Sequence, residues 1–211
     1  MTEPFDGIQG KSKEKLLQAL DAESVNVKKG TNIGYLIRGN NTIAIVTSGY
    51  IEIIKENEDG TRTIIDSLEE NDILSSSTLY IKDSDYETIT KEDTNLLLID
   101  LDTVINFQDE NKKYYKDFLK NLFLINNEKI RKRNERIQIL TKKTIRNKLL
   151  EYFKIESAKS GSRYVYLPST YLNLADYIAV DRSAMSRELK NLKDEGFIEM
   201  DGRKITLLYR W

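Results

Sequence analysis

One stretch of the chain, residues 108–140, contains neither glycine nor proline, and its apolar residues recur with the spacing of a coiled coil. Steps of alternately four and three residues separate the positions of the series Leu119, Phe123, Asn126, Ile130, Arg133, Ile137 and Leu140. A heptad repeat of this kind forms a seam along one helix that pairs with a second helix. We therefore predict one long helix here and a homodimer formed through it.

A second face of the same helix is also apolar and is free to pack against its own chain. It consists of Phe118, Leu122 and Ile125. An amphipathic helix that packs only within its own chain is the alternative explanation of the whole pattern. Asn126 and Arg133 would lower the stability of a dimer, although a polar seam residue can fix the register.

The residues before the long helix have the pattern of short strands. Runs rich in isoleucine, valine and tyrosine at residues 42–46 and 50–55 are bounded by turn clusters, and residues 96–101 form a closing apolar run. We predict an α+β protein with an amino-terminal antiparallel β-roll, a dimerisation helix and a carboxy-terminal domain. The expected boundaries are residues 1–108, 109–140 and 141–211.

The carboxy-terminal pattern is that of a winged helix-turn-helix. The predicted elements are a helix with the stripe Ile145, Leu149, Leu150 and Phe153, a strand at 164–167, helices at about 170–179 and 182–193, and strands at 197–200 and 204–209. Asp201-Gly202 predicts a type I′ turn between the last two strands. Helix, strand, helix, turn, helix and two-stranded wing is the order of this DNA-binding motif.

The third helix of this domain has one apolar and one cationic face. Met185, Leu189 and Leu192 share the face that must lie in the core, and Asp181 precedes the helix as an N-cap. The opposite face carries Arg182, Ser183, Ser186, Arg187, Lys190 and Lys193. Arginine in the major groove can donate two hydrogen bonds to guanine. A basic face exposed only to solvent is the alternative.

Charge is segregated along the chain although the net charge is only −1. Residues 1–108 carry 10 Lys/Arg and 20 Asp/Glu, whereas residues 141–211 carry 14 Lys/Arg and 9 Asp/Glu. An acidic front and a basic back favour a protein that turns its carboxy-terminal end toward a polyanion. We therefore expect double-stranded DNA as a partner.

Several classes of function are disfavoured by what the composition lacks. The chain has no cysteine and no histidine, which removes disulfides, the commonest zinc ligands and the usual general base. We expect no enzyme, cofactor or metal site. The polar start of the chain and the absence of a long apolar run predict a cytoplasmic protein with no membrane partner.

Residues 174–189, with the sequence LADYIAVDRSAMSREL, closely resemble the helix-turn-helix of the Crp–Fnr family of transcription regulators. Residues 49–53 and 71–74 are similar to that family's cyclic-nucleotide-binding roll, and the long helix lies where the family dimerises. The resemblance implies a homodimeric regulator on palindromic DNA, with RNA polymerase as a further partner. A metabolite-binding module whose winged helix mediates protein contacts is the alternative function.

The resemblance also assigns roles to residues of the DNA-binding domain. It places Arg187 on the family's base-reading arginine and Arg182 on an arginine that reads guanine. Ser186 matches a serine of some members, whereas Ser183 replaces a base-contacting glutamate, so the half-site should differ. Thr170, Lys190 and Arg203 are expected to contact phosphates.

The family's cyclic-AMP pocket is altered in this sequence. Ser76, Tyr86 and Glu87 fall where the family uses a glutamate for the ribose and an arginine and serine for the phosphate. Asn126 and Asn127 take the positions that present hydroxyls to the base. We expect no response to cyclic AMP and an effector that is unknown or absent. Iron–sulfur sensing is disfavoured because the chain lacks cysteine.

Overall fold

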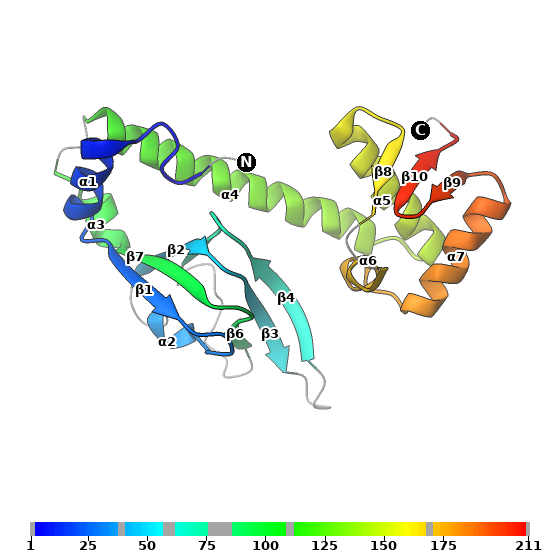
Figure 1. Ribbon diagram of the computed structural model, residues 1–211, viewed down its shortest axis with the longest axis horizontal. Helices are drawn as coiled ribbons and strands as arrows, with labels where there is room; N and C mark the ends of the chain where they lie inside the picture. Colours follow the sequence, from blue (N-terminus) through cyan, green and yellow to red (C-terminus); the bar gives the residue numbers. More distant parts are fainter. Residues whose placement is uncertain are drawn as a thin grey trace. The chain divides into compact units, whose positions relative to one another are not determined.

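The computed structural model describes residues 3–37, 41–56, 62–75, 86–108, 112–167 and 171–209. The chain divides into two compact units, Met1–Glu128 and Lys129–Trp211. The predicted α+β fold is confirmed, with antiparallel sheets in the first unit, a long helix, and a helix-turn-helix with its wing in the second (Figure 1). The division at residues 108 and 140 stays a prediction.

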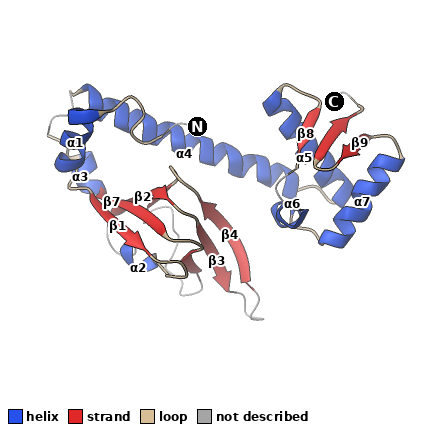
Figure 2. Ribbon diagram, in the orientation of Figure 1, coloured by secondary structure: helices blue, strands red, loops and turns tan. Residues whose placement is uncertain are grey.

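The strands of the first unit form two antiparallel sheets (Figure 2). One has the order β1 (Glu23–Val27), β7 (Thr94–Asp100), β2 (Thr42–Ser48) and β5 (Ile73–Ser75). The other has the order β4 (Arg62–Leu68), β3 (Ile51–Glu56) and β6 (Tyr86–Thr90). The last apolar run of the roll is β7, which pairs with β1 on one side and β2 on the other. Its interior position accounts for the burial of Leu96, Leu97 and Ile99.

Three short helices accompany the sheets: α1 (Gly10–Ala19), α2 (Gly34–Ile37) and α3 (Leu101–Ile105). Helix α3 begins after Asp100, whose carboxylate accepts hydrogen bonds from the backbone N–H groups of Asp102 and Thr103. Helix α1 was not predicted, because it begins with a glycine and its N-cap residue, Gln9, makes no side-chain cap. Its burial of Leu16 contributes to the core of the unit.

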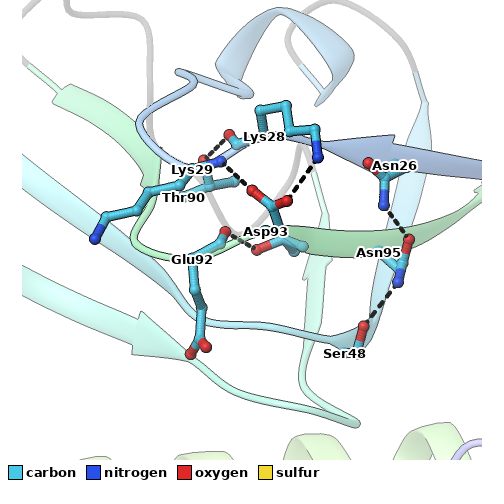
Figure 3. Close-up of polar contacts among 9 residues, drawn as sticks. Asn26, Lys28, Lys29, Ser48, Thr90, Glu92, Asp93 and Asn95 are labelled. Carbon is cyan, nitrogen blue, oxygen red and sulfur yellow. Dashed lines mark hydrogen bonds and ion pairs between the residues drawn. The ribbon is translucent and has the colours of Figure 1, made fainter.

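Polar side chains tie the strand ends of the roll together (Figure 3). Asp93 accepts hydrogen bonds from the Lys28 ammonium at 2.7 Å and from the backbone N–H of Lys29 at 3.0 Å. These two bonds lower the pKa of the Asp93 carboxyl. Nearby, Gly49 has a φ of 104°, and a Cβ there would lie 2.4 Å from the Thr94 hydroxyl oxygen. The turn before β3 thus requires glycine.

The long helix α4 (Lys113–Leu140) has one buried apolar face and one exposed apolar stripe, as the sequence predicts. The face made by Phe118, Leu122 and Ile125 is at most 9% exposed. The stripe is exposed at Leu119, Phe123, Asn126, Ile130, Arg133 and Ile137, whereas Leu140 is half-buried. A buried amide from the same helix, Asn121, donates hydrogen bonds to the carbonyls of Pro4 and Asp6. The amino-terminal segment is fixed to α4 in this way.

The second unit has the predicted winged helix-turn-helix order. Its elements are the end of α4, α5 (Ile145–Ser160), β8 (Tyr164–Tyr166), α6 (Tyr171–Ile178), α7 (Arg182–Asp194), β9 (Ile198–Asp201) and β10 (Lys204–Leu207). The sheet has the order β8-β10-β9. One core joins these elements, and its largest fully buried side chain is Phe153. Each helix therefore buries an apolar face on a common centre and leaves its opposite face to solvent.

The turn of the wing differs from the prediction by one residue. Asp201 pairs with Lys204, so the two turn residues are Gly202 and Arg203, not Asp201 and Gly202. Gly202 has a φ of 57°, whereas Arg203 has a negative φ. A type I′ turn needs positive φ at both positions, and a type II′ turn only at the first. The predicted type I′ turn is therefore wrong, because glycine occupies the first turn position instead of the second.

Across the described ranges, none of the helices combines the length and apolar character needed to cross a bilayer.

Candidate nucleic-acid interface

Helix α7 is fixed at its start and along its inner face by the residues that the sequence indicates. The Asp181 carboxylate accepts a 2.7 Å hydrogen bond from the backbone N–H of Ala184, which makes Asp181 the N-cap. Met185, Leu189 and Leu192 are at most 2% exposed. Their spacing of four and three residues puts them on one side of the helix, so the face that projects outward is determined as well.

The outward face of α7 consists of exposed cations and small hydroxyls. Its exposed residues are Arg182, Ser183, Ser186, Arg187, Lys190 and Lys193. Within the described part of the chain, none of these side chains makes a hydrogen bond or an ion pair. A cation that has no protein partner keeps its full capacity to donate hydrogen bonds to an anion. This face can therefore contact phosphates and the acceptor edges of bases.

Two acidic residues of α7 and its C-cap are neutralised from within the domain. The guanidinium of Arg146, on α5, donates one hydrogen bond to Glu188 at 2.6 Å and two to Glu195 at 2.6 and 2.7 Å. The bonds from Glu195 and then from Glu188 raise the pKa of Arg146, and Arg146 lowers the pKa of Glu195. These carboxylates are thereby held to the α5 side of the helix, and the potential of the outward face stays positive.

The turn between the two helices of the motif is a Schellman motif, a common end of a helix. The backbone N–H of Val180 bonds to the Ala175 carbonyl at 3.0 Å, and that of Ala179 to the Asp176 carbonyl at 3.3 Å. Ala179 has a φ of 51°, in the left-handed region that normally selects glycine. This turn leads directly into Asp181 and therefore decides where α7 begins.

The expected phosphate-binding residues lie in different parts of the domain. Lys190 is exposed on α7 and Arg203 is exposed in the turn of the wing, while Thr170 lies outside the described residues. Beside them, the Lys204 ammonium lies 4.3 Å from the centre of the Tyr164 ring. The structure thus provides exposed cations on both the helix and the wing.

The residues expected to form an effector pocket belong to different elements of the first unit. Tyr86 and Glu87 are half-buried on β6, and Asn126 and Asn127 are exposed on α4. Ser76 lies outside the described residues. A common pocket for these residues stays a prediction. The residues that the structure describes include no group of three or more acidic side chains placed to hold a metal ion.

Arg146 is the functional residue that the sequence did not reveal. It is separated by 42 and 49 residues from its two carboxylate partners, and it lies in a helix whose pattern indicated only a core stripe. A search for an arginine at the start of the first helix would have found it, but its partners depend on how α5 packs on α7.

Comparison with known proteins gives a family model for the second unit and a set of similar folds for the whole chain. The model of the Crp-like helix-turn-helix domain matches residues 145–210. A search of curated proteins finds no match to the sequence.

Solved structures of three regulators resemble the chain over most of its length. CprK complexed with OCPA has a TM-score of 0.67 at 16% identity, covering 92% of this chain and 89% of CprK. A CooA mutant from Carboxydothermus hydrogenoformans has a TM-score of 0.67 at 18% identity, with coverages of 98% and 91%. The c-di-GMP responsive global regulator CLP from Xanthomonas campestris has a TM-score of 0.56 at 16% identity, with coverages of 94% and 98%. At these identities the similarity establishes the fold.

Proposed function

We propose that this chain, which has a Crp-like helix-turn-helix domain and the fold of the Crp/Fnr regulators, is a sequence-specific transcription regulator that binds palindromic DNA as a homodimer. The observation that carries the proposal is the outward face of α7. Its arginines and lysines are exposed and unpaired within the described residues, while Glu188 and Glu195 are neutralised by Arg146. A polyanion with acceptor groups in its grooves fits such a face.

The cations of this face divide into two proposed roles. Arg182 and Arg187 are proposed to read bases, together with Ser183 and Ser186, because arginine matches the two acceptors of guanine with two parallel bonds. Lys190 and Arg203 are proposed to contact phosphates, since they flank the reading residues on α7 and in the wing. Thr170 is proposed as a further phosphate contact on the strength of the family resemblance.

The exposed stripe of α4 supports the homodimer. Phe123, Ile130 and Ile137 are between 54% and 65% exposed, which is unusual for three large apolar residues of one seam. Pairing of two such seams would remove this surface from water and place two copies of α7 in a fixed relation. A dimer of this kind reads two half-sites separated by one turn of DNA.

A binding-site selection followed by salt titration tests the DNA proposal. The parent protein should select a palindromic site, and Arg187→Ala should weaken binding by about 1–3 kcal/mol and relax the preference at one base pair of each half-site. Lys190→Ala should keep the base preferences and lower the slope of log K against log salt by about one unit per half-site contact. Lys154→Ala, an exposed lysine of α5, is the control and should change neither.

Two results would contradict the proposal. If the parent selects no sequence at moderate salt, it is not a sequence-specific DNA-binding protein, and the alternative of a protein-binding winged helix gains support. If Arg187→Ala and Lys190→Ala have the same base preferences and salt slopes, the division into base and phosphate contacts is wrong.

We further propose that cyclic AMP does not regulate this protein. A carboxylate, Glu87, stands where the resemblance expects the phosphate-binding site, so a phosphodiester would meet a like charge instead of a guanidinium. The change should weaken binding by roughly 2–5 kcal/mol. Calorimetric titration of the parent protein with cyclic AMP measures this, and a micromolar dissociation constant would contradict it.

A further inference from the structure

The carboxy-terminal end of α6 leaves three backbone carbonyls that the Schellman motif does not satisfy. The motif uses the carbonyls of Ala175 and Asp176. The carbonyls of Tyr177, Ile178 and Ala179 accept no backbone hydrogen bond outside the helix ladders in the described part of the chain. Unpaired carbonyls at a helix end carry its negative partial charge, and they attract cationic donors.

Two cationic side chains from other helices supply these donors. The Nε–H of Arg136, on α4, donates to the Tyr177 carbonyl at 3.1 Å. Lys148, on α5, donates from Nζ to the carbonyls of Ile178 at 3.0 Å and Ala179 at 3.1 Å. All three remaining carbonyls at the end of α6 are thus paired with cations.

The ring of Tyr177 strengthens the contact with Arg136. The guanidinium carbon lies 5.6 Å from the ring centre, and the ring also packs edge-on against Tyr152 at 6.0 Å. Burial raises the pKa of both tyrosines, so their hydroxyls stay neutral at physiological pH. Arg136 is therefore held by a hydrogen bond and by a neutral aromatic face at the same residue.

The turn that these cations hold is strained. Ala179 adopts a left-handed conformation, which costs free energy for any residue with a Cβ. Such a conformation persists only when surrounding contacts stabilise it. Two residues later, Asp181 caps α7. Relaxation of Ala179 would therefore move the start of the helix that carries the exposed arginines.

We infer that Arg136 and Lys148 are positioning residues for α7, which hold the α6–α7 turn by capping the end of α6. The part of this inference that concerns DNA rests on the proposed function. Their donors are directed to backbone carbonyls, so they act on DNA through the turn and not through phosphates. Arg136 lies between the stripe residues Arg133 and Ile137, so one hydrogen bond links the proposed dimerisation helix to the turn.

Amide hydrogen exchange at Val180 tests the cap without DNA. This N–H is bonded to the Ala175 carbonyl, so it exchanges when the turn opens. Arg136→Met and Lys148→Met keep the apolar stems and remove the donors, and each should speed exchange at Val180 by about tenfold. Lys154→Met, the same change at an exposed position of α5, should leave the rate unchanged.

Rescue distinguishes a cap on this turn from a general loss of packing. Ala179→Gly relieves the left-handed strain, and adding it to Arg136→Met should recover most of the lost protection at Val180. Arg136→Lys, which keeps a cationic donor, should have a smaller effect than Arg136→Met. Circular dichroism of each variant, with exchange in the core of the domain, shows whether it is folded.

DNA titration of the same proteins tests the positioning role. Arg136→Met and Lys148→Met should weaken binding several-fold with an unchanged salt slope, because the competent turn is less populated and no phosphate contact is lost. A slope that falls by about one unit would show instead that these cations contact phosphates. Unchanged exchange at Val180, or an equal effect of Lys154→Met, would overturn the cap. If the parent binds no DNA, the proposed function fails, and the exchange and rescue results still decide the cap.

Discussion

Helices α4 and α7 each bury one apolar face, and they differ in what they expose. Helix α4 presents Phe123, Ile130 and Ile137 to solvent, whereas α7 presents cations such as Arg182 and Arg187. An apolar stripe gains free energy when a similar surface excludes water from it, and a cationic face gains free energy from a polyanion. The difference teaches that the exposed face, and not the buried one, indicates the partner of each helix.

The largest effect is expected from charges placed on the α4 stripe. Phe123→Glu combined with Ile130→Glu should give monomers, because four carboxylates would face one another in a paired seam. Loss of the second half-site contact should lower the affinity for palindromic DNA by roughly a hundredfold or more. Sedimentation and DNA titration measure the two effects.

The matched control places the same two charges on a different side of α4. Asn134→Glu with Gln138→Glu changes exposed polar residues outside the stripe and should leave both the oligomeric state and the affinity unchanged. A parent protein that already sediments as a monomer at micromolar concentration would show that the stripe does not form a dimer.

The next effect compares the two faces of α7. Leu189 is 2% exposed, so Leu189→Ala should lower the free energy of unfolding of the carboxy-terminal domain by about 2–5 kcal/mol. Lys190→Ala, one residue away on the exposed face, should change it by less than about 0.5 kcal/mol. Urea denaturation of the two variants measures the difference, and equal losses would mean that the helix is oriented differently.

A smaller effect is expected from Ser183, which lies on the outward face beside the reading arginines. Ser183→Glu introduces a carboxylate that can accept a hydrogen bond from cytosine, so one base pair of each half-site should change its preference by about 1–3 kcal/mol. Binding-site selection with the parent and the variant shows the change. Selection of the same sequence by both proteins would place Ser183 away from the bases.

The smallest effect concerns the inward side of α7, where Arg146 pairs with Glu195. Since Arg146 lowers the pKa of Glu195 in the folded state, the stabilisation is present above the unfolded pKa of about 4.3 and is lost as the pH falls through the lower folded value. Between about pH 5 and pH 3 the parent should therefore lose more thermal stability than Glu195→Gln. Asp194→Asn, at a neighbouring exposed acid, is the control. Identical pH profiles for the parent and Glu195→Gln would mean that the pair does not form in solution.

The elements with strong local signals could be predicted closely. The expected third helix, residues 182–193, is Arg182–Asp194 in the structure, and its three inward residues are all buried. Helix α1 and the residue shift of the wing turn were missed. Neither has a distinctive local signal, because α1 lacks a capping side chain and the pairing of β9 with β10 selects which two residues turn.

The sequence by itself determined the faces of α4 and α7, because the period of a helix places residues three and four apart on one side wherever the helix lies. Only the tertiary structure decided which charges are neutralised. Arg146 meets Glu195, and Arg136 and Lys148 meet the end of α6, across 30 to 49 residues of chain. Those pairings depend on how α4, α5, α6 and α7 pack on a common core, which no local period encodes. The exposed cations of α7 could be predicted, but the contacts that keep α7 in place required the fold.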